Sequence, residues 1–432
     1  METINCTVKE NSTQKQCDRH PSGDRLKEVY SQFSSDSTST KNAEPALATT
    51  RFLCSKYMGG IWARAAATDY SVKPITGGMS NLLFLVELQG EEAKNANEPT
   101  KTLLRIHCQG DLNQQLTESV VFTLLSERGL GPRLLGIFPG GRFEQFIESR
   151  ALTCSEISQP RFARILAPMV GRVHTLDVPI TKEPQTLLVI KNWIAELEEL
   201  IGERDIKITT KQAKVDVNRV PSTIRANDLY KEVEFYQKFL DVANSPIVFS
   251  HNDLQEGNFL LANGYRVEED GVKAEGKVEN NTDPMVLIDF EYASYNYRGF
   301  DFGNHLCEYA FDYSSSEAPF YEIFSDRFND VEGRRTFATA YVDKIYELKS
   351  SAEMPHFPSD LVTGDREKDI EKVVEESILF MSLSHLFWSC WALVNAENAL
   401  VQFEYGSYGR DRLALYFDAK HLLEEFIRKH SS

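Results

Sequence analysis

Two short apolar runs separated by a polar insertion most constrain how this chain can fold. The runs are Asn258-Phe-Leu-Leu261 and Met285-Val-Leu-Ile288, and the segment 262–283 between them is rich in Gly, Glu, Lys and Asn. Apolar runs of this length predict two short strands. The polar segment predicts a solvated hairpin insertion between them.

Polar residues next to these strands have the order that phosphoryl transfer requires. The first strand follows Ser250-His-Asn-Asp-Leu-Gln-Glu-Gly-Asn258, and the second continues into Asp289-Phe-Glu291. In that chemistry an Asp accepts or orients the substrate hydroxyl proton, while an Asn and a second Asp hold Mg²⁺. Asp253 and Asn258 keep the D-x-x-x-x-N spacing of such a catalytic loop.

These positions predict a kinase-type site. We assign Asp253 as the catalytic base, and we place near the metal or the phosphates Asn258, Asp289, Gln255 and Glu291. Asn258 and Asp289 are the principal metal ligands, and Gln255 and Asp289 also belong to the nucleotide site. His251 is assigned to backbone support. Taken singly, either motif also fits an Asx-type turn or a capping Asp, but their combination favours the catalytic interpretation.

Composition limits the class of protein and the kind of partner. With 432 residues and 42% hydrophobic content, the chain can bury a large core, which predicts a two-lobed globular protein. A net charge of −17 argues against nucleic acid or an anionic membrane as partner and suits a small cationic substrate. ATP then needs a local patch of Mg²⁺, Arg and backbone N–H groups.

The cysteines and the apolar segments indicate the cellular compartment in which the protein is expected. Seven scattered cysteines without a C-x-x-C pair predict neither a disulfide framework nor a zinc site, which favours a reducing cytoplasm. The polar N-terminus does not resemble a secretory signal. The apolar run Ile378–Val394 is interrupted by Ser382, Ser384, His385 and Ser389 and is short for a membrane span, so it predicts a buried helix.

The pattern along the chain predicts an α+β protein. Residues 1–42 are polar and Ser-rich, which predicts a disordered tail. Residues 43–148 predict a small lobe with a helix from Pro45, an antiparallel sheet and a helix at 118–128; the predicted strands are 70–75, 81–88, 101–107, 133–138 and 142–147. Residues 149–432 predict a large, mostly helical lobe with a surface loop at 350–365.

A longer signature relates the chain to a known family. Ile288-Asp-Phe-Glu-Tyr-Ala-Ser-Tyr-Asn-Tyr-Arg-Gly-Phe-Asp-Phe-Gly-Asn-His305 resembles the choline/ethanolamine kinase family, whose relatives include aminoglycoside phosphotransferases within the protein-kinase-like superfamily. The resemblance extends from about Pro45 to the C-terminus. It implies a protein-kinase-like bilobal fold with ATP between the lobes, Mg²⁺ as the metal, and a homodimer.

The nucleotide site is expected in the first lobe. Between two predicted strands lies a loop whose small residues let backbone N–H groups approach phosphate oxygens: Thr76, Gly77, Gly78, Met79, Ser80, Asn81 and Leu82. The resemblance assigns Arg105 to the ATP phosphates, with Glu118 as a candidate ion-pair partner. It places the adenine against the segment of Gln145, Phe146 and Ile147. A plain hairpin turn, a solvated Glu118 and an ordinary interlobe strand are the alternatives.

The substrate site is expected among aromatic and acidic residues. A quaternary ammonium has no N–H donor, so a protein holds it with ring faces and carboxylates. In the family's pattern the positions that line the choline pocket are Trp388, Trp391, Phe403, Tyr405, Tyr408, Tyr313 and Phe320. Asp301 and Glu308 are candidates to supply charge, and Asp253 faces the hydroxyl. The alternatives are that the rings are ordinary core and that the two acids pair with Arg298 or His305.

Together these features predict a choline kinase that makes phosphocholine, the first intermediate on the way to phosphatidylcholine. Ethanolamine kinase, or an enzyme that accepts both substrates, is the nearest alternative, and the pair Trp388 and Trp391 favours choline. An aminoglycoside-type kinase does not fit the 288–305 signature. An inactive kinase-like scaffold would be expected to lose Asp253, Asn258 or Asp289, and all three are present.

Overall fold

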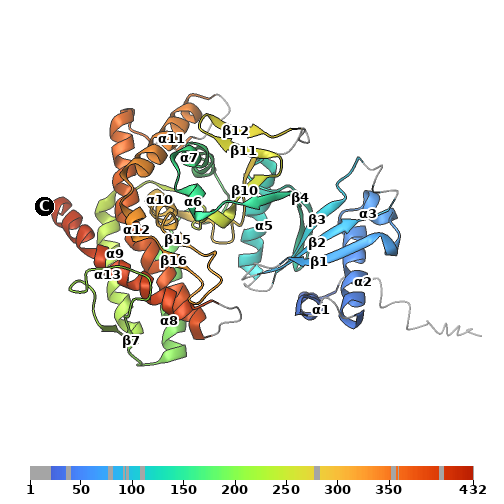
Figure 1. Cartoon of the computed structure of the whole chain (residues 1–432), viewed down its shortest axis with the longest axis horizontal. Coiled ribbons are helices and arrows are strands. Elements are labelled where there is room, and N and C mark those ends of the chain that lie inside the picture. Colours follow the sequence, from blue (N-terminus) through green and yellow to red (C-terminus); the bar gives the residue numbers. More distant parts are fainter. Residues whose placement is uncertain are drawn as a thin grey trace, which may run out of the picture. The chain divides into compact units, whose positions relative to one another are not determined.

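The chain forms two compact units (Figure 1). The computed structural model describes residues 21–35, 40–75, 81–90, 93, 97–107, 112–276, 283–351, 357–358, 360–397 and 403–431. Unit 1 contains residues 1–116 and 133–146, and unit 2 contains residues 117–132 and 147–432. The division after Phe146 lies close to the predicted boundary at 148. Residues 117–132, expected in the small lobe, group with unit 2 instead.

Unit 1 is built on an antiparallel sheet of five strands in the order β1-β2-β3-β5-β4. Its strands are β1 (Tyr70–Ile75), β2 (Asn81–Leu88), β3 (Lys101–His107), β5 (Gly141–Gln145) and β4 (Leu134–Phe138). On β2 the side chains of Phe84, Val86 and Leu88 are buried and those between them are half-buried, as expected for a strand with one covered face. The three strands predicted from 70 to 107 are confirmed with the expected bounds.

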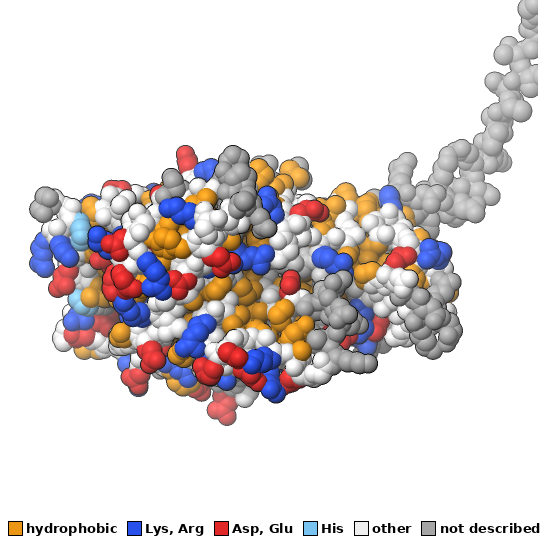
Figure 2. All heavy atoms as spheres, turned by 90° about the horizontal axis from the view of Figure 1, so that it is seen from above, with side chains coloured by type: hydrophobic (Ala, Val, Ile, Leu, Met, Phe, Trp, Pro, Cys, Tyr) orange, Lys and Arg blue, Asp and Glu red, His pale blue; other side chains and the backbone are white. Residues whose placement is uncertain are grey.

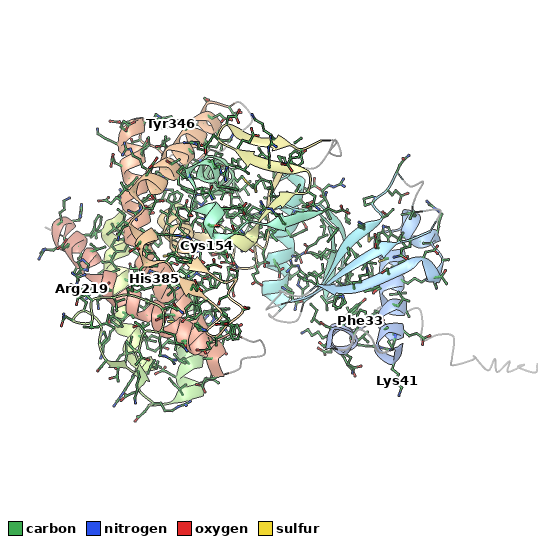
Figure 3. All side chains as sticks on the ribbon, in the orientation of Figure 1. Phe33, Lys41, Cys154, Arg219, Tyr346 and His385 are labelled. Carbon is green, nitrogen blue, oxygen red and sulfur yellow. The ribbon has the colours of Figure 1, made fainter. Side chains whose placement is uncertain are left out.

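Helices α1 (Gly23–Ser35) and α2 (Thr40–Tyr57) add to the unit 1 core. Leu26, Tyr30 and Phe33 of α1 are buried, and the rings of Tyr30 and Phe33 lie 4.9 and 5.8 Å from that of Phe84. Phe33 is labelled in Figure 3. The predicted tail over 1–42 is therefore wrong for 23–35, because these apolar residues recur at helical spacing within a Ser-rich segment. Residues 1–20 and 36–39 lie outside the described part.

Three further helical segments follow in this part of the chain. They are α3 (Gly60–Arg64), the 3₁₀ turn η1 (Ala67–Asp69) and α5 (Leu112–Glu127), whose residues fall on both sides of the division between units. The helix predicted from Pro45 begins earlier, at Thr40, so Pro45 lies inside α2.

Unit 2 is mostly helical, which confirms the α+β class with an antiparallel sheet in the first part of the chain. Its longer helices are α7 (Pro160–His174), α8 (Thr186–Ile201), α9 (Leu229–Ala243), α10 (Arg298–Glu308), α11 (Val331–Ser350), α12 (Arg366–Glu397) and α13 (Tyr405–His430), and short turns are α6 (Cys154–Ile157), η2 (Ala226–Asp228), η3 (Glu256–Asn258) and η4 (Ser325–Asn329). Small ladders join β6 (Ser149–Ala151), β10 (Phe259–Ala262) and β13 (Met285–Leu287), and pair β9 (Ile247–Ser250) with β14 (Ser294–Tyr297). The minor pairs are β7 (Ile206–Lys207) with β8 (Thr223–Ile224) and β15 (Phe311–Asp312) with β16 (Glu322–Ile323).

The segment between β10 and β13 contains the predicted hairpin. Strands β11 (Tyr265–Glu268) and β12 (Gly271–Ala274) pair, with the exposed ion pairs of Lys273 on one side. Val267 is buried, and both strands contact α7. The insertion is thus solvated on one face and packed on the other. Residues 277–282 are outside the described ranges.

Helix α12 forms the centre of unit 2, packed between α10 and α13. Ser382, Ser384, His385 and Ser389 are all buried, so the predicted buried helix is confirmed. Among the residues that the structure describes, α12 is long and apolar enough to cross a membrane, yet 89% of its apolar window is buried inside the protein.

Helix α10 approaches α12 very closely through two glycines. A Cβ atom at Gly303 would lie 2.4 Å from the backbone carbon of Phe380, and one at Gly299 would lie 2.4 Å from the Phe380 ring. Real Cβ contacts are never that short, so only glycine permits this spacing at Gly303 without a shift of backbone.

Charges of both signs share the surface. On the face shown in Figure 2, acidic and basic side chains are interspersed, so the net charge of −17 does not form a single patch there. This face offers no broad basic surface of the kind that binds nucleic acid.

Candidate active site

The loop that carries the predicted base is fixed by Asp301 of α10. The Asp301 carboxylate is fully buried and accepts the backbone N–H groups of His251, at 2.8 Å, and Asn252, at 2.7 Å. His174 Nε2 lies 3.0 Å from the same carboxylate. Both Asp301 oxygens therefore hold the loop in place. The assignment of Asp301 to the substrate stays a prediction.

His251 and Asn252, the two residues before the predicted base, form hydrogen bonds with backbone groups. His251 Nδ1 accepts the backbone N–H of Asp253 at 3.2 Å, and Nε2 lies 2.9 Å from the Ile288 carbonyl, which it can donate to. Burial lowers the pKa of His251 below its ordinary value, which keeps the ring neutral. Asn252 adopts a left-handed φ of 67° and donates to the Tyr292 carbonyl at 2.8 Å. Sequence reasoning did not single out Asn252.

The Asp253 carboxylate is oriented by two amides of its own loop. Asn258 Nδ2 donates to Oδ2 at 2.9 Å and to the Asp253 carbonyl at 2.8 Å, and Gln255 Nε2 lies 3.4 Å from Oδ2. Within the part of the chain that the structure describes, the other oxygen, Oδ1, takes no hydrogen bond. The predicted base therefore keeps one oxygen for a further donor.

Other carboxylates act electrostatically on Asp253. Burial, and then the charges of Glu308, Asp289 and Glu291, raise the pKa of Asp253 to about 8. Like charges gathered in a poorly solvated site are stabilised by a cation.

The second strand places Asp289 next to the end of the loop. The Ile288 N–H donates to the Asn258 carbonyl at 2.9 Å, and Asp289 follows with a left-handed φ of 64°. The Asn258 amide oxygen and the carboxylates of Asp289 and Glu291 are hard oxygen donors of the kind Mg²⁺ prefers. No cluster of at least three His, Cys, Asp or Glu side chains stands ready to bind a metal in the described ranges. This sparse set suits Mg²⁺, which usually binds to one or two carboxylates, waters and substrate phosphates.

Arg105, the residue predicted to bind the ATP phosphates, is paired with Glu144 of β5. Arg105 Nε and Arg142 Nε both donate to Glu144 Oε1 at 2.7 Å, and all three side chains are buried. Burial alone would raise the pKa of Glu144, but the charges of Arg105 and Arg142 outweigh it and lower that pKa. Sequence reasoning missed Glu144. Glu118 lies in unit 2, so its pairing with Arg105 stays a prediction.

The other residues assigned to the nucleotide site stay predictions, and the structure places some of them. Thr76, Gly77, Gly78, Met79 and Ser80 lie outside the described residues, while Asn81 and Leu82 begin β2. The backbone N–H of Gln145 donates to the Arg133 carbonyl at 2.8 Å, so this N–H is not available to a purine. The division between the units falls between Phe146 and Ile147, as expected for an interlobe segment.

Six of the seven predicted aromatic residues form one group in unit 2. Ring centroids lie 5.4 Å apart for Trp388 and Trp391, 5.5 Å for Trp391 and Tyr405, and 4.9 Å for Tyr405 and Phe403. Phe403 lies 5.5 Å from Tyr408 and 6.4 Å from Tyr313. We call these six residues the aromatic group.

The six members of the aromatic group differ in how far their side chains are buried. Trp388, Tyr405 and Tyr408 are buried, whereas Trp391, Phe403 and Tyr313 are half-buried and can face a ligand. Within the described residues, Phe320 makes no ring contact with the group. Tyr292, one residue after Glu291, lies 5.4 Å from Trp388 and was missed by sequence reasoning. Its position directly after the 288–291 motif is the signal that could have indicated it.

Glu308, at the end of α10, accepts hydrogen bonds from Arg412 and from the Tyr313 hydroxyl, the latter at 2.8 Å. The alternative partners considered for the acids are engaged elsewhere. Arg298 donates to Glu376 at 2.8 Å, and His305 Nδ1 lies 2.8 Å from the Leu254 carbonyl. Arg412 is 104 residues from Glu308, and no local pattern indicated it.

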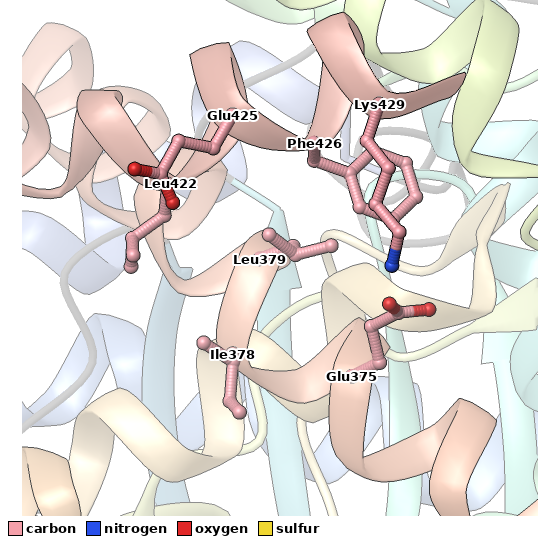
Figure 4. Close-up of a pocket in the computed structure, with 7 residues that line it drawn as sticks. All are labelled: Glu375, Ile378, Leu379, Leu422, Glu425, Phe426 and Lys429. Atoms are coloured by element: carbon pink, nitrogen blue, oxygen red, sulfur yellow. The ribbon is translucent and has the colours of Figure 1, made fainter.

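A shallow surface pocket lies elsewhere, between α12 and α13 (Figure 4). Its lining consists of Glu375, Ile378, Leu379, Leu422, Glu425, Phe426 and Lys429. None of these was a predicted site residue.

Comparison with known proteins relates the chain to a family. The family profile described as choline/ethanolamine kinase matches residues 72–417. A Caenorhabditis elegans protein named choline kinase A2 is 38% identical over 86% of this chain and 85% of its own length, and a Rattus norvegicus choline/ethanolamine kinase is 33% identical over 87% and 86%. A Cryptosporidium parvum choline kinase structure, 22% identical, superposes with a TM-score of 0.64 over 88% of this chain and 96% of that one, which shows the fold. This chain belongs to the choline/ethanolamine kinase family.

Proposed function

We propose that this protein transfers the γ-phosphoryl group of ATP to the hydroxyl of choline, giving phosphocholine and ADP. One observation carries the proposal: Asp253 is oriented by Asn258 and Gln255 and is acted on by the charges of other carboxylates, in the same unit as the aromatic group. Membership of the choline/ethanolamine kinase family supports it, as do relatives named choline kinase.

The residues of this chain divide the chemistry between them. Asp253 Oδ1 accepts the hydroxyl proton as the choline oxygen bonds to the γ-phosphorus and the bond to the ADP oxygen breaks. Asn258 and Gln255 hold the carboxylate in one orientation during this step. Mg²⁺, held by Asn258 and Asp289 with Glu291 nearby, would neutralise phosphate charge. Catalysis by such a site is mainly positioning and electrostatic stabilisation.

The substrate cation is recognised by the half-buried rings of the aromatic group. Each ring face contributes about 0.5–2 kcal/mol to the binding of a quaternary ammonium. Ethanolamine is the second candidate substrate, because several relatives are named choline/ethanolamine kinase. A primary ammonium carries N–H donors and needs acceptors, for which Glu308 is the nearest candidate in this group.

The setting of the enzyme is proposed from the same features. The four described cysteines, Cys54, Cys154, Cys307 and Cys390, are free and buried, which suits a reducing cytoplasm. The negative net charge argues against nucleic acid as a partner. A homodimer is the assembly that family membership implies.

The test is steady-state phosphorylation of choline and of ethanolamine with Mg-ATP by the wild type, Asp253→Asn and Asp270→Asn. We expect choline to have the higher kcat/KM, and Asp253→Asn to lower kcat by at least about 100-fold because a positioned base contributes 10²–10⁴. Asp270 lies in the β11–β12 turn and, among the described residues, forms an ion pair with Lys273 alone, so its variant controls for loss of a carboxylate. Ethanolamine preference would move the assignment to that substrate. Turnover of neither would contradict the proposal.

A further inference from the structure

Arg412 of α13 is fully buried, and each of its guanidinium nitrogens has a partner. Nε donates to the Tyr408 hydroxyl at 2.9 Å, and Nη1 lies 3.2 Å from His385 Nδ1. Nη2 donates to Glu308 and lies 3.3 Å from the Tyr313 hydroxyl. The guanidinium carbon is 3.6 Å from the centre of the Phe311 ring. The planar fork of Arg permits this set of bonds, and the single ammonium of Lys does not.

The other titratable groups in contact with Arg412 are neutral, so Glu308 is its counter-charge. His385, labelled in Figure 3, accepts from Arg412 through Nδ1, and Nε2 lies 3.7 Å from Cys307 Sγ. Burial, and then the charge of Arg412, lower the pKa of His385 well below its ordinary value. Burial raises the pKa of the Cys307 thiol to about 12. One positive and one negative charge therefore cancel beside the aromatic group.

The same contacts fix two rings of the aromatic group. The Tyr313 hydroxyl donates to Glu308 at 2.8 Å and lies 3.1 Å from the Tyr408 hydroxyl, which accepts from Arg412. Both hydroxyls are thus held by the Arg412–Glu308 pair. What remains for a ligand at Tyr313, the half-buried member, is the face of its ring.

This arrangement distinguishes the two candidate substrates by their chemistry. A quaternary ammonium has no N–H group and is attracted to ring faces without needing an acceptor. A primary ammonium has three N–H donors and loses hydrogen bonds to water unless acceptors replace them. A carboxylate already paired with a guanidinium is a poor replacement.

We propose that Arg412 is a positioning residue that sets the preference for choline over ethanolamine, by cancelling the charge of Glu308 and holding the hydroxyls of Tyr313 and Tyr408. The inference rests on the proposed function and specifies how its substrate site selects. Arg412 acts through Glu308 and the two tyrosines rather than by contact with the substrate.

The experiment compares kcat/KM for choline and ethanolamine in the wild type, Glu308→Gln, Arg412→Met and the double variant. Glu308→Gln leaves a buried cation without its partner beside the ammonium site, and we expect KM for both substrates to rise at least tenfold. Arg412→Met frees the carboxylate, and the choline-to-ethanolamine ratio should fall at least tenfold. In the double variant both charges are gone, so KM for choline should recover at least fivefold from Glu308→Gln.

Two results would overturn the inference. A double variant no better than Glu308→Gln would mean that the Glu308 carboxylate itself holds the ammonium. A folded Arg412→Met variant with an unchanged ratio would leave Arg412 a purely structural role. Should Arg412→Met not fold, Arg412→Lys replaces it: this variant keeps the charge, and its ratio should stay within threefold of wild type, whereas a tenfold shift would reject charge cancellation.

A matched control uses the other buried Arg–Glu pair of unit 2. Arg298 donates to Glu376 at 2.8 Å, and both are almost fully buried. The double variant Arg298→Met/Glu376→Gln should change thermal stability without moving the substrate ratio. Wild-type enzyme that turns over neither substrate would reject the proposed function, whereas choline turnover with unmoved ratios would reject the inference alone.

Discussion

The Asp301 carboxylate of α10 accepts the backbone N–H of Asn252 at 2.7 Å, one residue before the proposed base. This bond, together with that from the His251 N–H, makes the position of Asp253 depend on a helix 48 residues further along the chain.

Asp301→Asn should therefore act on kcat. The amide cannot accept from both N–H groups and from His174, and a buried donor left unsatisfied costs about 1–3 kcal/mol. We expect kcat to fall at least tenfold while KM for choline stays within threefold, with lower stability in urea unfolding. A tenfold rise in KM with kcat unchanged would instead support the original assignment of Asp301 to the substrate cation.

Glu144→Gln should weaken the use of ATP. The change removes the carboxylate to which Arg105 and Arg142 both donate, and breaking a buried ion pair costs about 3–5 kcal/mol. Kinetics at varied ATP and choline should show a rise of at least fivefold in KM for ATP alone. Glu118→Gln is the comparison: a larger effect there than at Glu144 would restore Glu118 as the partner of Arg105.

Asp289→Asn should impair catalysis with Mg²⁺ without lowering the stability of the fold. Asn tolerates the left-handed φ of 64° as well as Asp does, so the melting temperature should stay close to wild type, whereas Ala at this φ adds about 1–2 kcal/mol of strain. Loss of the carboxylate should lower kcat at least 100-fold, measured over a Mg²⁺ titration. Wild-type kcat at saturating Mg²⁺ would show that Asp289 is not an essential ligand.

His305 should make the protein less stable as the pH falls. Burial lowers the pKa of His305 to about 4 in the folded state, so between pH 6.5 and 4 the unfolded chain binds a proton that the folded protein does not. The stability it contributes is complete above pH 6.5 and is lost towards pH 4. His305→Asn keeps a donor for the Leu254 carbonyl and removes this titration.

The measurement is the unfolding free energy of wild type and His305→Asn at pH 7.5 and 5. The difference between the two proteins should shift against wild type by about 2 kcal/mol at the lower pH. Asp253 and Glu256, whose raised pKa values act with the opposite sign, are present in both proteins and cancel. A difference independent of pH would show that His305 titrates normally in the folded state.

Local patterns predicted the elements that depend on neighbouring residues. The strands β1, β2 and β3 follow from apolar residues within eight positions, and Asp253 and Asn258 lie five apart with their hydrogen bond formed inside one loop. Helix α1 was missed because Leu26, Tyr30 and Phe33 are sparse within a polar segment and become core only against Phe84.

The remaining residues of the site depend on contacts between distant segments. Arg105 and Glu144 are 39 residues apart, and Arg412 and Glu308 are 104 apart. Asp301 was recognised as an important acid, but only the fold reveals that its oxygens accept the N–H groups of His251 and Asn252. The sequence shows which residues carry a charge, but only the fold shows which residue each of them pairs with.

The close contact between α10 and α12 at Gly299 and Gly303 bears on the length of substrate that the proposed enzyme accepts. Asp301 lies between Gly299 and Gly303 on the helix that fixes the Asp253 loop, while Trp388 and Trp391 belong to the helix against which these glycines lie. At Gly303 the neighbouring atoms belong to the backbone of α12, so rotation of side chains cannot adjust how closely the two helices lie there. The number of carbons that separates the hydroxyl from the nitrogen of an acceptable amino alcohol is then set by how closely two helices pack.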